Sequence, residues 1–352
     1  MQTDFLIIGQ GISGTFLSKY LIEAGKHVAV VDDGITSSSR IASGVINPVT
    51  GRRIVRTWMI EKLIAFAKPA YHEWGEMIGR PIIKETGLID FHPSVQMQQS
   101  FLQRQLEENE FLHEEKDTDE WKRLFNFHYG AGRIAPCFIV DLNTMLNFWR
   151  GVLRQKDLLI EETFQWRDCN FKDGKVRWRH VEAEKIVFCN GASHFADSPF
   201  DRLPFANNKG EAIIAEIPGL PRGHIYKQSL SIVPWEEDLF WIGSSYEWNY
   251  QDALPNPAFK ERVQTQLKNW LKLPFRIVDH LAAERPATVE RRPFAGLHPR
   301  YPNIAILNGM GTKGCSLAPF FARQLADHLT SNSPIDPMAD VKRFSKVLSS
   351  NS

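Results

Sequence analysis

The N-terminal residues alternate between apolar runs and a helical pattern, which predicts a β-α-β unit. Phe5–Ile8 is a continuous apolar run, as is typical of a strand buried on both faces of a parallel sheet. Apolar residues then recur at helical spacing over about Ile12–Ala24, and Gly25 is placed to end that helix. His27–Val31 is a second apolar run of strand length. We therefore expect two parallel strands joined by a helix.

A glycine loop connects the first strand to this helix. It has the spacing GxGxxG and comprises Gly9, Gly11, Ile12, Ser13 and Gly14. The first glycine permits a tight turn, the second lets the backbone approach a pyrophosphate, and the third lets helix and strand pack closely. The helix N-terminus offers N–H groups and a positive dipole to phosphates. The loop predicts a dinucleotide site; the alternative is a glycine-rich turn without a ligand.

Two acids, Asp32 and Asp33, close the second strand. Asp32 follows Gly14 at about the spacing of 20 residues at which an acid accepts hydrogen bonds from adenosine ribose hydroxyls. An acid here disfavours a 2′-phosphate. The pattern therefore favours FAD or NAD over NADP.

A second glycine loop lies near the C-terminus and favours FAD over NAD. The segment Asn303–Asn308, which is apolar between its two asparagines, predicts a strand, and a helical pattern covers about Leu317–Leu329. The loop between them contains Gly309, Gly311, Thr312, Lys313 and Gly314. Too little chain remains after this loop for a second dinucleotide site. We expect its helix to direct its N-terminus at the flavin end of the same FAD, where amides stabilise negative charge. The alternative is a close crossing of helix and strand with no ligand.

The composition excludes several classes of protein. Lys and Arg number 42 against 41 for Asp and Glu, which argues against a dedicated nucleic-acid or membrane-surface protein. No apolar run reaches the length of about 18 residues that spans a bilayer. We expect a cytoplasmic protein that does not bind membranes.

The four cysteines and the histidines predict no metal site. The cysteines show neither a CxxC pair nor a zinc-knuckle spacing, so we expect reduced thiols. The histidines form no HxxxH or HExxH arrangement.

The order of the motifs resembles the FAD-dependent amino-acid oxidase family, which includes glycine, sarcosine and D-amino-acid oxidases. The resemblance covers nearly the whole chain. Beyond the two loops it is carried by Ser39–Pro48, Thr86–Ile89, Ile186–Ala192, Lys209–Glu211, Ile232–Pro234, Glu284–Thr288 and Pro293–Gly296. In the family, the first of these stretches wraps the pyrophosphate and one flavin face, and the third returns to FAD. The resemblance thus adds to the cofactor site Ser39, Arg40, Ser43, Gly44, Val45, Ile46, Asn190 and Gly191.

The resemblance also implies a fold and a division of the chain. The fold class is α/β, with a Rossmann-like FAD-binding domain interleaved with an α+β substrate domain built on an antiparallel sheet. The FAD-binding domain would use 1–68, 137–201 and 281–347, and the substrate domain 69–136 and 202–280, with a tail at 348–352. FAD would be non-covalent, because the family's linking cysteine falls near Arg285, where this chain has none.

The activity implied is an FAD-dependent oxidoreductase acting on CH–NH or CH–NH2 donors. It would oxidise the C–N bond of a small amine, an amino acid or an N-substituted glycine, with hydride passing to the flavin and the imine then hydrolysed. Arg285 would pair with the substrate carboxylate, or else form a structural ion pair. Lys313 would place a cation near the flavin, or else be a solvated loop lysine.

Two other functions stay open. Within the family, the resemblance is strongest to the flavin half of the bacterial bifunctional enzyme that modifies the tRNA wobble uridine, where it removes a carboxymethyl group. The methyltransferase half of that enzyme is absent from this sequence. A tRNA partner would require a basic rim, for which Arg52–Arg56, Arg177–Arg179 and Arg291–Arg292 are candidates. The third hypothesis is a non-catalytic flavin-binding partner protein.

Overall fold

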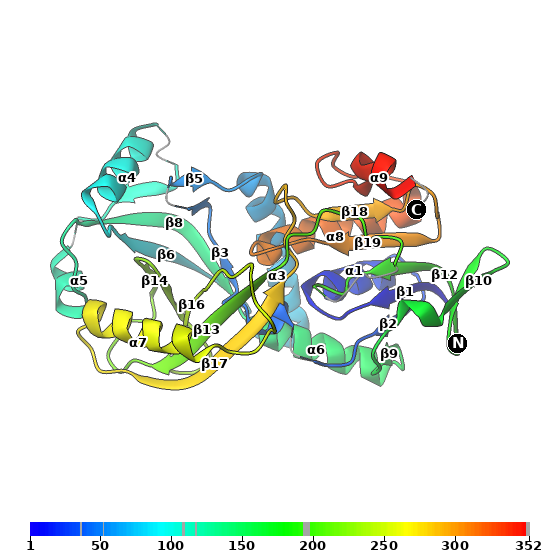
Figure 1. Cartoon of the computed structure of the whole chain (residues 1–352), viewed down its shortest axis with the longest axis horizontal. Helices are drawn as coiled ribbons and strands as arrows, with labels where there is room; N and C mark the ends of the chain where they lie inside the picture. Colours follow the sequence, from blue (N-terminus) through cyan, green and yellow to red (C-terminus); the bar gives the residue numbers. More distant parts are fainter. Residues whose placement is uncertain (36, 52, 108–109, 117, 193–197, 350–352) are drawn as a thin grey trace.

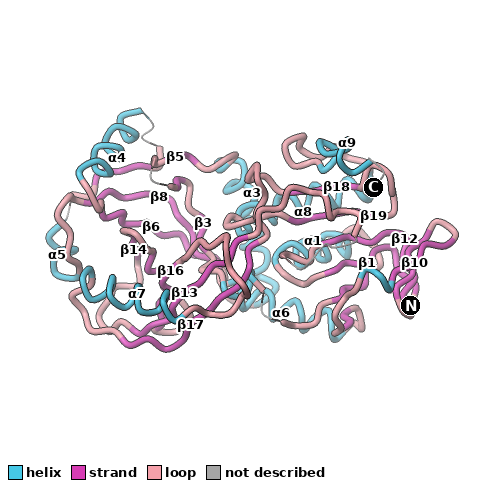
Figure 2. Tube along the Cα trace, in the orientation of Figure 1, coloured by secondary structure: helices cyan, strands magenta, loops and turns pink. Residues whose placement is uncertain are grey.

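A computed structural model describes residues 1–35, 37–51, 53–107, 110–116, 118–192 and 198–349 (Figure 1). The molecule is elongated, with one sheet at each end and helices between and around them. Both chain termini lie at the same end. Figure 2 shows the same arrangement by secondary structure.

The first sheet carries the N-terminal glycine loop. Its strands are β1 (Gln2–Ile8), β2 (Val28–Val31), β9 (Leu159–Ile160), β10 (Cys169–Lys172), β11 (Lys175–Trp178), β12 (Val181–Phe188), β18 (Phe294–Leu297) and β19 (Ile304–Asn308). Its centre is parallel in the order β9, β2, β1, β12, β19. Strands β11 and β18 pair antiparallel with β12 and β19. The expected pair of parallel strands is confirmed, and β12 is inserted between β1 and the C-terminal strand.

The apolar run in β1 is buried on both faces, as its pattern predicts. Phe5 and Ile7 pack in one cluster with helices α1 (Ile12–Glu23) and α8 (Gly314–Ser331). Leu6 and Ile8 pack in the opposite cluster, which also holds Leu348. Leu348, which the sequence places in a tail, is a buried residue of α9 (Ser345–Ser349). Residues 350–352 lie outside the described ranges.

The second sheet is mainly antiparallel. Its strands are β3 (Val45–Ile46), β6 (Ile83–Phe91), β7 (Leu112–Glu114), β8 (Ala131–Val140), β13 (Asn208–Glu216), β14 (His224–Lys227), β15 (Ser231–Pro234), β16 (Leu239–Gly243) and β17 (Arg276–Arg285). The order is β17-β13-β16-β15-β14-β6-β8-β3, with β7 on β8, and β14 is parallel to β6. Strand β17 stands at one edge and runs toward the first sheet (Figure 1).

The remaining elements connect or cover these sheets. They are α2 (Ser38–Ile41), β4 (Val49–Thr50), β5 (Val55–Arg56), α3 (Ile60–Ile78), α4 (Val95–Glu107), α5 (Thr118–Leu124), α6 (Leu142–Gln155), η1 (Trp166–Asp168), α7 (Pro257–Trp270) and η2 (Val341–Phe344). Within the described residues, no helix is both long and apolar enough to cross a membrane.

The mixed α/β architecture confirms the expected fold class. The division into sequence segments stays a prediction. Strand β3 belongs to the second sheet although it falls in 1–68, and β8 and β17 run across the predicted boundaries at 136/137 and 280/281.

Candidate functional site

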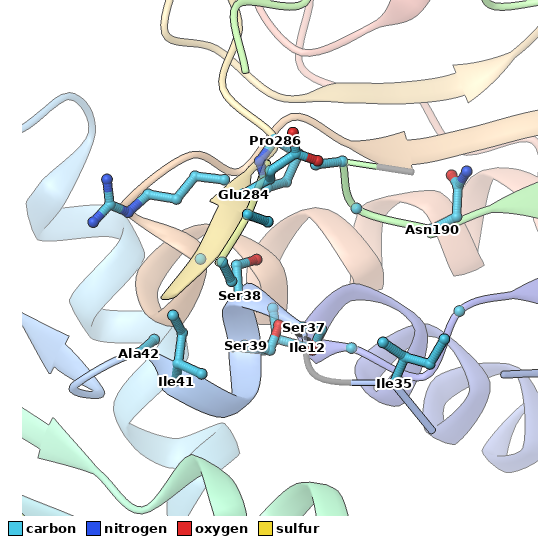
Figure 3. A pocket seen from close by; sticks show the side chains of 18 of the residues that line it. Ile12, Ile35, Ser37, Ser38, Ser39, Ile41, Ala42, Asn190, Glu284 and Pro286 are labelled. Carbon is cyan, nitrogen blue, oxygen red and sulfur yellow. Dashed lines mark hydrogen bonds between the residues drawn. The ribbon is translucent and has the colours of Figure 1, made fainter. Parts of the chain in front are cut away.

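A cavity of about 1000 Å³, the main cavity below, extends from the N-terminal glycine loop to the end of β17. Figure 3 shows Glu284 and Pro286 on one side of it and Ser38 and Ser39 on the other, with Asn190 further along. Most predicted site residues line its wall. These are Gly9, Gly11, Ile12, Ser13, Asp32, Asp33, Ser39, Ser43, Asn190, Gly191, Arg285, Gly311, Thr312 and Gly314.

The N-terminal loop has the geometry of a phosphate cradle. Gly9 has a φ of +98°, which favours glycine, and its N–H donates to the carbonyl of Val31 at 2.8 Å. A Cβ on Gly14 would lie 1.9 Å from the Gly9 carbonyl oxygen, so only glycine fits this crossing. Gly11 brings no side chain to cap α1, and Ile12 N–H donates to Ser39 Oγ at 3.1 Å. The loop thus fits the pyrophosphate of a dinucleotide.

Asp32 directly follows β2, and its carboxylate is already oriented. Its Oδ2 accepts from the Gln10 N–H at 2.7 Å, and its Oδ1 accepts from Arg150 Nη1 at 2.6 Å. Arg150 also donates to Glu161 at 2.9 Å. Sequence reasoning missed Arg150, because no local pattern shows that α6 places it beside the end of β2.

Replacing Asp32 with asparagine is expected to weaken FAD binding about 10- to 100-fold. Hydrogen bonds to a charged group are worth about 1.5–3 kcal/mol, and the change also leaves Arg150 without one of its two carboxylates. FAD dissociation constants are measured by fluorescence titration of the apoprotein. Asp4→Asn is the matched control, since Asp4 also accepts a backbone hydrogen bond, from the His27 N–H at 2.8 Å, but does not line the cavity. An equal or larger loss in Asp4→Asn than in Asp32→Asn would contradict the assignment.

A further segment at this end of the cavity was not predicted from the sequence. Glu162–Trp166 lines the wall, because β9 pairs with β2 and carries the segment to the carboxyl end of that strand. Its residues include two aromatic side chains, which suit the wall of an adenine pocket.

The second glycine loop brings three strand ends together. Asn308 donates from Nδ2 to the Gly191 carbonyl at 2.9 Å, and its Oδ1 accepts from the Gly309 N–H at 2.8 Å. Gly311 N–H donates to the carbonyl of Pro286 at 2.9 Å. Helix α8 starts at Gly314, earlier than the apolar pattern indicates, because that pattern marks only the buried face. The ends of β12, β17 and β19 therefore meet at the N-terminus of α8.

Some predicted cofactor residues are not in the cavity wall. These are Gly14, Arg40, Gly44, Val45, Ile46, Gly309 and Lys313. Val45 and Ile46 pair with β8, and Arg40 donates to Asn147 and Gln10. Direct contact of these residues with a cofactor stays a prediction.

Lys313 is the N-cap residue of α8, and it is half-buried. Burial lowers the pKa of Lys313 from 10.5 to about 8, partly opposed by the thiols of Cys137 and Cys315. The Lys227 ammonium lowers the pKa of Lys313 further. Burial raises the pKa of both thiols to about 12. A role for Lys313 near the flavin stays a prediction.

The depressed pKa of Lys313 predicts how stability depends on pH. Between about pH 8 and 10.5 the folded chain has released this proton while the unfolded chain retains it, so stability should rise with pH. Thermal midpoints of the wild type and Lys313→Met, compared across this window, isolate the effect. Parallel curves for the two proteins would show that folding does not lower the pKa of Lys313.

Arg285 is held at the end of β17 by neutral groups. Its Nη1 donates to Asn208 Oδ1 at 2.9 Å and to the Ser245 carbonyl at 3.0 Å. The guanidinium carbon lies 4.7 Å from the centre of the Tyr246 ring. A Cβ on Gly210 would lie 1.8 Å from Arg285 Nη2, so the guanidinium rests on bare backbone. Burial lowers the pKa of Arg285, with Tyr246 opposing.

This arginine lacks the carboxylate partner that a structural ion pair would need. Within the described residues, no carboxylate lies at ion-pair distance from Arg285. The neighbouring Glu284 instead accepts a hydrogen bond from Tyr250. Burial and, second, this hydrogen bond raise the pKa of the Tyr250 phenol to about 12. Nη2 and Nε of Arg285 have no protein acceptor among the same residues. The guanidinium therefore faces the cavity with donors to spare.

The family model for FAD dependent oxidoreductases matches residues 4–328. The chain belongs to this family. Its members use FAD, and this agrees with the cradle, the ribose acid and the second loop. The chain is thus an FAD-dependent oxidoreductase.

Individual relatives cover the chain from end to end. It is 25% identical to glycine oxidase from Pseudomonas aeruginosa, over 96% of this chain and 98% of the relative. The crystal structure of glycine oxidase from Geobacillus kaustophilus has a TM-score of 0.81 at 17% identity and covers 100% of both chains. Iminodiacetate oxidase from Chelativorans sp. BNC1 has a TM-score of 0.75 at 17% identity and covers 94% of this chain and 96% of its own. The two structures share the fold.

Proposed function

We propose that the protein oxidises the C–N bond of an amino acid or N-substituted glycine, with Arg285 binding the substrate carboxylate. The observation that carries the proposal is the unpaired guanidinium in the cavity wall. A charged group that is partly desolvated and has no counter-ion is costly unless a ligand supplies one. A planar carboxylate fits the free fork of an arginine.

The cavity residues fit FAD along its whole length. The loop of Gly9–Gly14 would hold the pyrophosphate, Asp32 the ribose, and the N-terminus of α8 the flavin end. FAD, when bound, supplies the acceptor for hydride from the substrate carbon. We propose that it is held non-covalently, since burial raises the pKa of both cavity thiols, Cys189 and Cys315, and so disfavours the thiolate that a covalent bond would need.

The protein's own residues then orient the substrate and exclude water. Arg285 holds the carboxylate, and this fixes the Cα–H bond relative to the cavity wall. Trp241 lines the wall and is locked by donating from Nε1 to the Ile41 carbonyl at 2.9 Å. Hydrolysis of the imine needs only water, so no acid–base triad is required.

Names of the relatives agree with this substrate class. Glycine and iminodiacetate, which the two relatives are named for, both present a carboxylate beside an amine.

The basic clusters that a tRNA would need are partly neutralised, because Arg177 pairs with Glu182 and Arg179 with Glu162. Arg56 pairs with Glu61 and Glu110, while Arg52 lies outside the described residues.

Anaerobic bleaching of the yellow holoenzyme tests the proposal. The panel contains glycine, sarcosine, D-amino acids, D-proline and tRNA bearing carboxymethylaminomethyl uridine. We expect at least one amino acid of the panel to bleach the flavin within a catalytic timescale. Bleaching by the tRNA alone would instead establish a tRNA-modifying enzyme, and a flavin that nothing in the panel reduces would favour a non-catalytic binding protein.

A further inference from the structure

We infer that the loop 244–256 is the recognition site for an aromatic substituent, so the substrate is an aromatic amino acid or N-arylalkyl glycine. This inference rests on the proposed function, because it starts from a carboxylate on Arg285. It concerns which substituent the substrate carries, which oxidation of the C–N bond itself does not determine.

The loop presents large apolar side chains to solvent beside the main cavity. Tyr246 is 51% exposed, Trp248 64% and Leu254 66%. Tyr246 and Leu254 line the cavity, and the Tyr246 and Trp248 rings lie 6.2 Å apart with planes 31° from parallel. Clustered exposed apolar groups beside a cavity mark a binding surface.

The patch is continuous with the carboxylate site. Tyr246 carries the Arg285 guanidinium over its ring, 4.7 Å from the centroid. A substrate with its carboxylate on Arg285 therefore places its substituent toward Tyr246 and the neighbouring Trp248. The pairing of an unpartnered cation with adjacent aromatic rings is complementary to a molecule that has an anionic end and an aromatic end.

Buried polar bonds hold the loop in place. Lys209 and Glu247 exchange two backbone hydrogen bonds of 2.8 and 3.0 Å. Glu211 is fully buried; its Oε2 accepts from the Asn256 N–H at 2.6 Å and lies 2.9 Å from His280 Nε2. Both ends of the loop are thus pinned to β13. The backbone that carries the aromatic residues is thus held without substrate, which lowers the entropic cost of binding.

Trp248→Ala in the holoenzyme is the direct test, since Trp248 does not contact Arg285. We compare flavin reduction by N-benzylglycine with reduction by sarcosine, which carries a methyl group in place of the benzyl group. The variant is expected to lower kcat/KM for N-benzylglycine at least tenfold more than for sarcosine. Tyr129→Ala is the control, because Tyr129 is a 39% exposed aromatic residue that lies outside the loop 244–256, with its ring against His128. It should change kcat/KM for the two substrates by the same factor.

A binding measurement separates this inference from the proposed function. Phenylacetate and acetate are titrated into the wild type and into Trp248→Ala. The spectrum of the oxidised flavin reports binding, so no turnover is required. Tighter binding of phenylacetate that is weakened about tenfold by Trp248→Ala supports the inference even if neither amine reduces the flavin. Equal affinities for both acids in both proteins would overturn it. So would self-association of the wild type that Trp248→Ala abolishes without changing either affinity, because the patch would then be a contact between copies.

Discussion

Replacing Arg285 with glutamine is expected to lower kcat/KM for the amino-acid substrate about 10- to 100-fold, while the yellow holoenzyme still forms. A charged hydrogen bond is worth about 1.5–3 kcal/mol, and each 1.4 kcal/mol is a factor of ten. Arg285→Lys should recover part of the loss, because an ammonium restores the charge without the planar fork. Stopped-flow reduction of the flavin measures both variants.

Gly210→Ala offers an independent way to displace the same guanidinium. The new Cβ would stand 1.8 Å from Arg285 Nη2, the flexible end of a side chain, so the chain should fold with the guanidinium moved aside. We expect a loss similar to that of Arg285→Gln. Both losses should vanish with an amine that has no carboxylate. Unchanged kcat/KM in Arg285→Gln would contradict carboxylate binding by this residue.

Replacing Gly14 with alanine is expected to abolish FAD retention. Here the added Cβ meets the backbone carbonyl of Gly9 at 1.9 Å, and neither partner is a movable side chain. Helix α1 must shift away from the loop, which costs about 1–3 kcal/mol or more and spoils the cradle. The ratio of flavin to protein absorbance after purification and the thermal midpoint report the two effects.

Gly151→Ala is the matched control for that substitution. Gly151 lies inside α6, and an added Cβ meets nothing within 4 Å. Alanine there should leave FAD retention unchanged and raise stability by up to about 1 kcal/mol, as expected of a helix interior. If Gly14→Ala retained FAD as well as Gly151→Ala does, the close crossing would not be required for binding.

Local patterns were sufficient to predict the two ends of the cofactor site. The first strand, its helix and the second strand carry complete signals in consecutive residues, and the structure confirms them as β1, α1 and β2. The C-terminal strand and helix are confirmed in the same way as β19 and α8. Each signal depends on backbone requirements that only certain residues meet, so it can be recognised without knowledge of the tertiary structure.

The rest of the site depends on pairings that no local pattern contains. Arg150 reaches Asp32 only because α6 packs beside the end of β2, and a helical arginine with an acid some residues later is common on any surface. Tyr246 meets Arg285 through a loop fixed by the buried Glu211. The free fork of Arg285 is likewise a property of its surroundings, since its sequence context is equally compatible with an ion pair.

The position of β12 between β1 and β19 has a consequence for biosynthesis. A ribosome releases the N-terminal strand with only β2 to pair with, and the strands that occupy its other side are translated much later. Until then an apolar strand edge is open to other chains, the situation in which nascent proteins aggregate. The second glycine loop follows β19, so the wall of the main cavity is complete only after β19 has emerged.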